Sequence, residues 1–380
     1  MKLYYRVNDY YPVDVEGSSA ASSVRHRVDR VCRCLPNNVE LTIYSIVKSK
    51  NVSIAKRETH IVSNSGQCIT FFVASNIVGA ILKGLLSIYL MVYLVSKLVS
   101  KENYILIYNL LPANILIYIF TSYIFPSILR KTIFQIEEIY SVYNFSFLKR
   151  LLTLLSERNI FKRGVNFIVV NENVKDLIQR DDVNAIVDYG YNSRNGKAIE
   201  PITASNKIIY TGRLDFVGGI EVLLQAVSEL PTDIKNKIVV TGSGGLKDLV
   251  VKRAAELGIS YEGFLSDSEY ESLLINAKIS INPLRSKCNF SSYSFPSKVL
   301  QYLEYGCVVI SSGIAQPELE SYFSDELLTY TNDDPNKLNS LIKETNPQAY
   351  DKSTIIKKYH IFMEMKEKKL HSFFSSILRG

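Results

Sequence analysis

The sequence predicts an α/β protein of two domains, each built around a doubly wound parallel sheet. The chain has 380 residues, which is enough for two hydrophobic cores. In its second half, short apolar segments alternate with segments of helical periodicity, which is typical of a parallel sheet with covering helices. In its first half, a short strand leads into a loop of small residues and then a helix, as in a nucleotide-binding fold.

Composition excludes several other classes of protein. Hydrophobic residues make up 47% of the chain and charged residues 21%, which excludes a disordered or collagen-like chain. The five cysteines are scattered and odd in number, so they predict no disulfide framework and favour a reducing, cytoplasmic location. The N-terminal segment MKLYYRVNDYYP lacks the apolar core of a secretory signal.

Charge is distributed unevenly along the chain. Residues 1–200 hold 24 Lys and Arg against 16 Asp and Glu, whereas the remaining residues hold 20 against 21. A basic first half is typical of a protein that meets an anionic membrane surface, nucleic acid or a phosphorylated substrate. Because basic runs interleaved with aromatics and Cys/His zinc spacings are both missing from the sequence, nucleic acid is not expected as a partner.

The first domain is expected to span residues 1–203. Its predicted elements, in order, are a strand at Leu3–Val7, the small-residue loop Glu16–Ser23, a helix to about Leu35, a strand at Val39–Val47, a strand at 104–109 with its covering helix, a strand at Thr132–Glu138, a helix at Phe147–Glu157, a strand at Val165–Val170, a helix at Glu172–Gln179 capped by Asn171, and a strand and linker at Val187–Ile202.

Two apolar stretches of this domain are long enough to compare with membrane spans. Ile77–Val99 contains Lys83 and Lys97, and Tyr104–Leu129 is interrupted by prolines and asparagines. Buried helices and strands of the sheet explain both stretches, so no bilayer span is expected. A helix face that rests on a membrane surface is the alternative that the basic surroundings leave open.

The second domain is expected at residues 204–350. Five strands are predicted at 207–210, 237–242, 259–264, 279–284 and 308–312, with helices at about 219–230, 246–257, 267–276 and 296–305. A long helix, Thr354–Leu378, forms most of a third segment, 351–380, which is expected to pack back on the first domain. Two such domains face each other across a cleft, and ligands bind there at the carboxyl ends of the strands.

The first candidate site follows the first strand of the second domain, in TGRLDFVGG. Arg213 comes directly after Gly212 at the end of the strand, and Gly218-Gly219 opens a helix. An arginine in this place can bind a diphosphate through its forked guanidinium, although a surface salt bridge is the alternative.

A second glycine-rich turn is Gly242-Ser243-Gly244-Gly245. It lacks the complete spacing of a dinucleotide fingerprint and follows the second strand of its domain. The sequence therefore predicts a tight turn facing the cleft between the domains.

The third candidate site is the segment SSYSFPSKVLQYLEYG. Pro296 is expected in the first turn of a helix, with Ser294 and Phe295 before it. The amide groups of Ser297 and Lys298 then face an anion, which the helix dipole also favours. Lys298, Gln301, Tyr302 and Tyr305 are predicted to share one face of this helix, opposite a core face of Val299, Leu300 and Leu303.

These segments together resemble the C-terminal domain of retaining GT-B glycosyltransferases of family 4, which build bacterial capsule and O-antigen polysaccharides. The resemblance lies in Gly212-Arg213-Leu214, in Tyr261-Glu262-Gly263-Phe264 through Asn282-Pro283, and in Phe295 to Tyr302. It covers roughly residues 207–345. The first half of the chain matches only in outline, through its small-residue loop and the segment IEEIYS.

The resemblance implies a role for each matched position. Arg213 and Lys298 neutralise the donor diphosphate, the segment Ser294–Lys298 binds the distal phosphate or sugar, Gly263-Phe264 holds the nucleobase and Gln301 the ribose. The glycines Gly212, Gly242 and Gly244 line the donor, and Gly17 and Ser18 close over it from the first domain. It also implies transfer with retention, without metal or other cofactor, from a nucleotide sugar to a lipid-linked or growing polysaccharide acceptor. The expected location is the cytoplasm, peripherally at the inner face of the cytoplasmic membrane.

The chain departs from the family pattern at three positions. Gly218 stands where the family usually has a lysine, and Tyr293 and Gln301 stand where it has two glutamates. Lys298 is then the remaining second cation. These departures leave open an alternative function, a catalytically inactive GT-B partner or regulator of an active transferase. A sugar-nucleotide epimerase or an NAD-dependent enzyme is not expected, because the acid–base cluster and the complete fingerprint are missing from the sequence.

In the first domain, Glu137 and Glu138 follow a predicted strand on its cleft side. One of them is expected to orient or deprotonate the acceptor hydroxyl, and Asn109 occupies a similar strand end. A structural carboxylate is the alternative.

Overall fold

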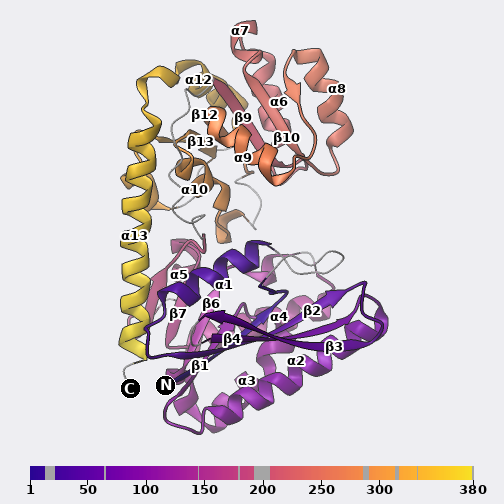
Figure 1. Ribbon diagram of the computed structural model, residues 1–380, viewed down its shortest axis with the longest axis vertical. Helices are drawn as coiled ribbons and strands as arrows, with labels where there is room; N and C mark the ends of the chain where they lie inside the picture. Colours follow the sequence, from indigo (N-terminus) through magenta and orange to yellow (C-terminus); the bar gives the residue numbers. More distant parts are fainter. Residues whose placement is uncertain are drawn as a thin grey trace. The chain divides into compact units, whose positions relative to one another are not determined.

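The computed structural model describes residues 1–12, 22–63, 66–143, 145–178, 180–191, 206–285, 291–312, 316–331 and 333–378. The chain divides into two compact units, each with its own sheet (Figure 1). Unit 1 comprises Met1–Asn192 with Lys366–Gly380, and unit 2 comprises Ser193–Met365. Gly17 and Ser18, which were expected to close over a donor, lie outside the described residues.

Unit 1 is built on an eight-stranded sheet in the order β3-β4-β2-β1-β5-β6-β7-β8. Neighbouring strands pair in parallel except β3, which is antiparallel to β4. The strands are β1 (Lys2–Asn8), β2 (Glu40–Ser49), β3 (Ala55–Ser63), β4 (Gly66–Ala74), β5 (Asn103–Tyr108), β6 (Thr132–Ile136), β7 (Asn166–Val169) and β8 (Asn184–Val187).

Helices cover both faces of this sheet, because successive side chains of a strand point to opposite sides. On one face, Leu3, Tyr5 and Val7 of β1 join a core with α1 (Ser22–Cys34) and the last part of α13 (Lys352–Ile377). On the other face, Arg6 of β1 donates a hydrogen bond to Ser87 of α2 (Ile77–Lys97). This second face also carries α3 (Pro112–Ile124) and α4 (Phe147–Arg163).

Aromatic contacts place α3 and α4 on the same face as α2. Tyr118 of α3 lies edge-on to Phe134 of β6, with 5.5 Å between ring centroids. Phe161 of α4 lies 6.4 Å from Phe167 of β7, which in turn contacts Phe134. Three neighbouring helices therefore form one layer over this side of the sheet.

Most predicted elements of unit 1 are confirmed with small shifts, and one pair was missed. The strand expected within Val187–Ile202 lies earlier, at β8, and residues 192–202 and most of the loop Glu16–Ser23 lie outside the described residues. The strand expected to end at Glu138 ends at Ile136, and α5 (Glu172–Asp176) is shorter than predicted, although Asn171 caps it by accepting a hydrogen bond from the amide of Val174. The hairpin of β3 and β4 was not predicted. Because β3, AKRETHIVS, is a mostly charged and polar edge strand, it gave no apolar signal.

The long apolar helix α2 is half-buried rather than buried throughout. Its length and composition suffice to cross a membrane, yet only 28% of its most apolar window is buried. Its inner side packs on the sheet through Leu90, Met91 and Leu94, and Lys83 pairs with Asp9 at 3.1 Å. The expectation that this stretch is a helix of the sheet is confirmed, but its outer side is exposed.

Unit 2 has a six-stranded, all-parallel sheet in the order β11-β10-β9-β12-β13-β14. The strands are β9 (Lys207–Arg213), β10 (Ile238–Ser243), β11 (Ser260–Tyr261), β12 (Ala277–Asn282), β13 (Val308–Ser312) and β14 (Leu327–Tyr330). The helices include α6 (Ile220–Ser228), α7 (Thr232–Lys235), α8 (Lys247–Leu257), α9 (Asp267–Asn276), α10 (Ser297–Glu304), α11 (Pro317–Tyr322) and α12 (Pro335–Glu344). The alternation predicted from the sequence is confirmed, whereas the edge strand β14 and the helices α7, α11 and α12 were missed.

The last helix, α13, contributes to both cores. In unit 2, Phe362 lies 5.4 Å from Phe323 between ring centroids. In unit 1, Leu370, Phe373 and Phe374 join the cluster formed by β1 and α1. The unit boundary, between Met365 and Lys366, therefore falls inside this helix.

Candidate functional site

Arg213 stands at the carboxyl end of β9, as the sequence predicts. Its side chain is 70% exposed, and its guanidinium pairs with Asp215 at 2.5 Å. The other oxygen of Asp215 accepts a hydrogen bond from the amide of Gly218 at 2.8 Å. Asp215 thus holds the arginine to the loop that follows the strand, while most of the guanidinium remains accessible to solvent.

The loop after β9 contains two glycines, Gly218 and Gly219, at positions where the neighbouring backbone leaves no room for a side chain. A Cβ at Gly218 would lie 2.3 Å from the carbonyl oxygen of Arg213, and one at Gly219 would lie 1.7 Å from that of Pro283. Gly219 also has a positive φ of 71°. The position where a lysine was expected from the family pattern is therefore filled by backbone, and the loop in this conformation accepts no side chain there.

Lys298 is the second cation at the end of β9. Its ammonium lies 3.0 Å from the hydroxyl of Thr211 and 3.4 Å from that of Tyr270. Burial lowers the pKa of Lys298 to about 8. Among the described residues, the polar partners that the structure gives this ammonium are uncharged hydroxyls, so its charge is available to an anion.

Tyr270 of α9 connects Lys298 to Gln301. Its hydroxyl donates to the side-chain carbonyl of Gln301 at 2.7 Å and lies 3.2 Å from the hydroxyl of Thr211. The motif pattern predicted roles for Gln301 and Lys298 but none for Tyr270, which lies 28 residues before Lys298. A capping box between Ser266 and Glu269 fixes the start of α9, and this was the one sequence signal near Tyr270.

The start of α10 differs slightly from the prediction. Pro296 is the N-cap rather than a first-turn residue, because its ψ of 87° is not helical, and the helix begins at Ser297. A side-chain cap is missing from this described terminus, so the first amide groups remain available to a ligand. Before the helix, Ser294 is half-buried and Phe295 is buried.

Two tyrosines predicted to share a face with Lys298 are in fact buried. Tyr302 is fully buried, and its hydroxyl lies 2.8 Å from that of Thr211. Tyr305 is 2% exposed, and its hydroxyl donates to Glu271 of α9 at 3.1 Å. The shared face is confirmed, since Lys298 and Tyr302 both contact Thr211. Its burial was not predicted, because α9 and β9 cover it and the periodicity of one helix cannot reveal that.

The glycines of the second turn are required by packing of the chain on itself. A Cβ at Gly242, where φ is 134°, would lie 1.8 Å from the carbonyl oxygen of Gly212, and one at Gly244 would lie 2.4 Å from that of Leu214. The tight turn is confirmed. Because these glycines have no side chains, the loop after β10 can pack directly on the end of β9. This packing accounts for both glycines, and no ligand is needed to explain them.

Gly263 and Phe264, the expected nucleobase site, follow β11. The carbonyl of Gly263 accepts hydrogen bonds from the amide of Gly242 at 2.8 Å and the hydroxyl of Thr241 at 2.6 Å, so it is already engaged. Gly263 has a positive φ of 71°, and the ring of Phe264 is 83% exposed. An exposed aromatic ring offers a stacking surface to a base.

A third cation at this edge, Arg285, was not singled out from the sequence. It follows β12, lies 4.0 Å above the ring of Phe216 and donates to Glu221 at 3.2 Å. Its amide donates to the carbonyl of Val217 at 3.1 Å. The loop that carries Arg213 is therefore fastened to the end of the neighbouring strand.

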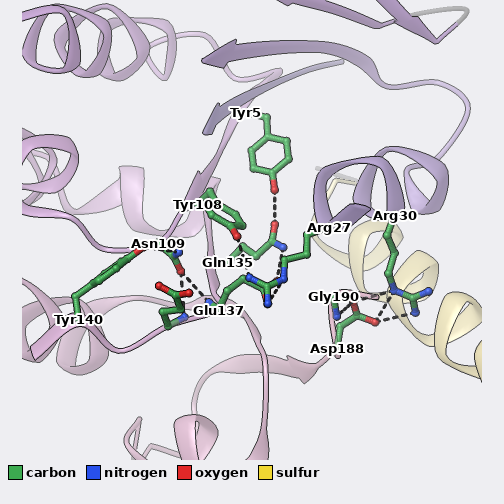
Figure 2. A network of polar contacts seen from close by, with 11 residues as sticks. Tyr5, Arg27, Arg30, Tyr108, Asn109, Gln135, Glu137, Tyr140, Asp188 and Gly190 are labelled. Carbon is green, nitrogen blue, oxygen red and sulfur yellow. Dashed lines mark hydrogen bonds and ion pairs between the residues drawn. The ribbon is translucent and has the colours of Figure 1, made fainter. Parts of the chain in front are cut away.

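The strand ends of unit 1 carry a polar network (Figure 2). Glu137 follows β6 and is 2% exposed. Its carboxylate accepts a hydrogen bond from Gln135 at 2.7 Å and pairs with Arg27 of α1 at 3.3 Å. Gln135 in turn accepts from the hydroxyl of Tyr5, and Arg27 donates to that of Tyr108 at 3.2 Å.

This burial corrects the expectation for Glu137. The carboxylate was expected to act on an acceptor from the cleft side of its strand end, but Arg27 and the closely packed Gly190 enclose it. A Cβ at Gly190 would lie 2.9 Å from its oxygen. Burial raises the pKa of Glu137, and the charge of Arg27 opposes that rise. This burial favours the alternative, a structural carboxylate.

Asn109 and Glu138 complete this strand end, where Asn109 is 2% exposed and only Glu138 is half-buried. Asn109, with a φ of 56°, accepts hydrogen bonds from the amides of Glu137 at 2.8 Å and Glu138 at 3.3 Å. Its amide group donates to the hydroxyl of Tyr140 at 3.1 Å (Figure 2). Asn109 therefore shapes the turn after β6, and Glu138, whose side chain is half-buried, remains the candidate that contacts an acceptor.

Arg30 makes a second ion pair in unit 1. Its guanidinium binds both oxygens of Asp188, with the shortest contact at 2.8 Å, and pairs with Glu367 of α13 at 3.2 Å. Arg30 is 1% exposed. The pair ties α1 and the last part of α13 to the segment after β8.

Among the described residues, no group of three or more His, Cys, Asp or Glu side chains is placed so that it could hold a metal ion.

Comparison with known proteins agrees with this architecture. Residues 205–345 match the family described as glycosyl transferases group 1. The match covers most of unit 2 and leaves unit 1 outside it. No curated protein matches the chain.

Solved structures match over the whole chain at low identity. HepE from Anabaena in complex with UDP has a TM-score of 0.64 at 11% identity, covering 100% of both chains. A trehalose-6-phosphate structure from E. coli, bound with UDP-2-fluoro glucose, has a TM-score of 0.63 at 10% identity, covering 100% of this chain and 99% of the other. The chain has the two-domain GT-B fold.

A third GT-B structure extends the comparison. Sucrose-phosphate synthase from Thermosynechococcus elongatus has a TM-score of 0.61 at 12% identity, covering 99% of this chain and 96% of the other. At these identities the likeness shows the GT-B fold and not a shared substrate.

Proposed function

We propose that this protein is a glycosyltransferase that uses a nucleotide sugar, and that unit 2 binds the donor at the carboxyl ends of β9 and β10. The observation that carries the proposal is the position of Lys298 at the uncapped start of α10, where its ammonium faces the hydroxyls of Thr211 and Tyr270. It lies inside the segment that matches group 1 glycosyl transferases.

The electrostatics of this site suit a diphosphate. A half-buried ammonium whose pKa is depressed gains stability when an anion comes close, because the anion offsets the cost of burying the charge. The first amides of α10 add donors beside it, and Arg213 offers a mostly exposed guanidinium at the same strand end. In this proposal Lys298 and Arg213 stabilise the leaving diphosphate.

The rest of the donor meets residues at the neighbouring strand ends. The exposed ring of Phe264 stacks on the nucleobase, and Gln301 faces the ribose once Tyr270 yields its hydrogen bond. Transfer proceeds with retention and without a metal, to a lipid-linked or growing polysaccharide acceptor. The retention, the absence of a metal and the class of acceptor are supported by the resemblance of the motifs to family 4 glycosyltransferases.

Calorimetric titration with UDP-, GDP-, dTDP- and CMP-sugars tests donor binding. One nucleotide class should bind, and Arg213→Ala should weaken it at least tenfold, or about 1.4 kcal/mol. Arg253→Ala is the matched control, because Arg253 is an exposed arginine of the same unit paired with Glu256. If all four classes fail to bind the wild-type protein, the proposal is wrong and an inactive partner protein replaces it.

The acceptor side of the reaction is assigned to Glu138. We expect Glu138→Gln to lower kcat by a factor of about 100 while the dissociation constant of the donor stays unchanged. Glu137→Gln should instead lower stability, because Glu137 holds Arg27. An unchanged kcat in Glu138→Gln contradicts the assignment, and the anomeric configuration of the product, measured by NMR, tests retention.

A further inference from the structure

The layer of three helices on unit 1 exposes many apolar side chains. The described residues include 25 exposed large hydrophobic side chains. Seventeen of them belong to this layer: seven to α2, five to α3 with its C-cap, and five to α4. Soluble monomers expose such side chains singly, so this concentration indicates a surface that is covered in use.

These side chains lie on neighbouring helices of one face. α2 packs beside α3 and α3 beside α4, and all three cover the same side of the sheet (Figure 1). Leu85 on α2 is 58% exposed, Phe120 on α3 is 69% exposed, and Phe147 on α4 is 83% exposed. We call this surface the α2–α4 face.

Charge on the α2–α4 face is almost entirely positive. Lys83 and Lys97 lie on α2, Arg130 and Lys131 lie on the turn η1 (Pro126–Lys131) after α3, and five cations lie on α4. Lys83 is paired with Asp9, so the other eight carry the positive charge of the surface. The sequence of these segments contains a single carboxylate, Glu157. It is 3% exposed and accepts hydrogen bonds from the amides of Tyr140 and Ser141, so it does not offset the positive surface.

We propose that the α2–α4 face docks unit 1 on the surface of a bilayer that contains anionic phospholipid. Apolar side chains among cations are what an interfacial surface needs, because the hydrocarbon boundary accepts the former and the phosphate groups attract the latter. Exposed Tyr89 and Tyr123 suit the headgroup level, where tyrosine is favoured. The inference does not depend on the proposed glycosyl transfer.

The contacts of α2 favour lying on the bilayer over crossing it. A Cβ at Gly79 would lie 1.7 Å from the carbonyl oxygen of Ala74, so the first turn of α2 is tightly packed on the end of β4. Ser87 accepts a hydrogen bond from the fully buried Arg6, and Lys83 pairs with Asp9. If α2 left the sheet to span a membrane, the guanidinium of Arg6 would lose its hydrogen bond to Ser87 and its cover by α2. Lys83 would also lose its ion pair with Asp9.

Flotation of the full chain with vesicles tests this proposal. Vesicles of phosphatidylcholine alone are compared with vesicles that also contain about 30% phosphatidylglycerol. We expect binding to the anionic vesicles, weakened at least tenfold by Phe147→Ser with Leu148→Ser and about fivefold by Lys149→Gln with Arg150→Gln. Leu249→Ser with Val251→Ser on α8 is the matched control and should bind as the wild type does.

Three outcomes overturn the proposal: no flotation with anionic vesicles, equal flotation of all variants, or a dimer in sedimentation velocity that Phe147→Ser with Leu148→Ser dissociates while vesicles go unbound. The last outcome assigns the α2–α4 face to a second copy of the chain. Because the substituted side chains are exposed, the variants should keep the melting temperature of the wild type. Donor titration is measured separately, so a protein that floats but binds no nucleotide sugar fails only the proposed function.

Discussion

The two sheets end in polar residues that serve different purposes. At the strand ends of unit 1, Glu137 and Asp188 are buried, and each is paired with an arginine of α1. At those of unit 2, Lys298 is surrounded by uncharged hydroxyls and Arg213 is mostly exposed. Buried charges that are paired inside the protein hold it together. A cation without a carboxylate partner among the described residues, such as Lys298, or one that stays exposed beside its partner, such as Arg213 beside Asp215, is suited to an external anion. The predictions below test this difference.

The largest effect is expected from breaking the ion pair of Arg30 and Asp188. Arg30→Ala leaves the carboxylate of Asp188 buried without its partner, which costs about 3–5 kcal/mol of unfolding free energy. Urea denaturation followed by circular dichroism measures it. Arg33→Ala, which removes an exposed partner of Glu367, should cost under about 1 kcal/mol. Equal losses in the two variants would show that the buried pair is not special.

A smaller loss is expected where the two loops of unit 2 touch. Gly242→Ala places a Cβ against the carbonyl of Gly212 at a φ of 134°, which should cost about 2–4 kcal/mol. Gly245→Ala, where a Cβ meets no atom within 4 Å, should cost under about 1 kcal/mol. Thermal unfolding compares them. If Gly242→Ala were as stable as the wild type but lost donor binding, the glycine would serve the ligand rather than the loop.

Removal of the ammonium of Lys298 should affect binding more than folding. Lys298→Ala takes one charge-assisted contact from the donor diphosphate, and we expect affinity to fall by about 2 kcal/mol, or roughly thirtyfold. The free energy of unfolding should not fall, because a half-buried charge without a counter-ion is removed. Calorimetry and urea denaturation of the same variant test both statements, and a destabilised variant with normal affinity would refute them.

The pH dependence of donor affinity is the smallest expected effect, and it distinguishes Lys298 from other titrating groups. With a pKa of about 8, Lys298 loses its proton as pH rises through 8, so donor affinity should fall by up to tenfold per pH unit above it. Because this pKa lies below its usual 10.5, the unfolded chain binds more protons between about pH 8 and 10.5, and stability contributed by this group rises there.

Lys298→Arg provides the control for this titration, since a guanidinium keeps its charge throughout this range. In that variant the affinity should stay level between pH 8 and 10. A decline as steep as that of the wild type would assign the titration to another group.

Most of the fold could be predicted from the sequence, and the failures have physical causes. Alternating apolar strands and amphipathic helices predicted most of unit 2, because parallel strands are buried on both faces and appear as apolar runs. The polar edge strand β3 was missed because it lacks that signal. Motif spacing located Arg213 and Lys298 but not Tyr270, since its contact with Lys298 joins two helices that are distant in the sequence.

The sequence by itself determined most of the elements, the alternation of strands and helices in unit 2, and the two cations at its strand ends. Only the tertiary structure decided which charged groups are paired. Glu137 and Glu138 are adjacent and chemically alike, yet Arg27 encloses the first and leaves the second half-buried. In the same way, periodicity showed that α2 is apolar, but packing against the sheet decided which of its sides remains exposed. The reason is that burial and the strength of a charge depend on neighbours brought together by folding, which local spacing does not record.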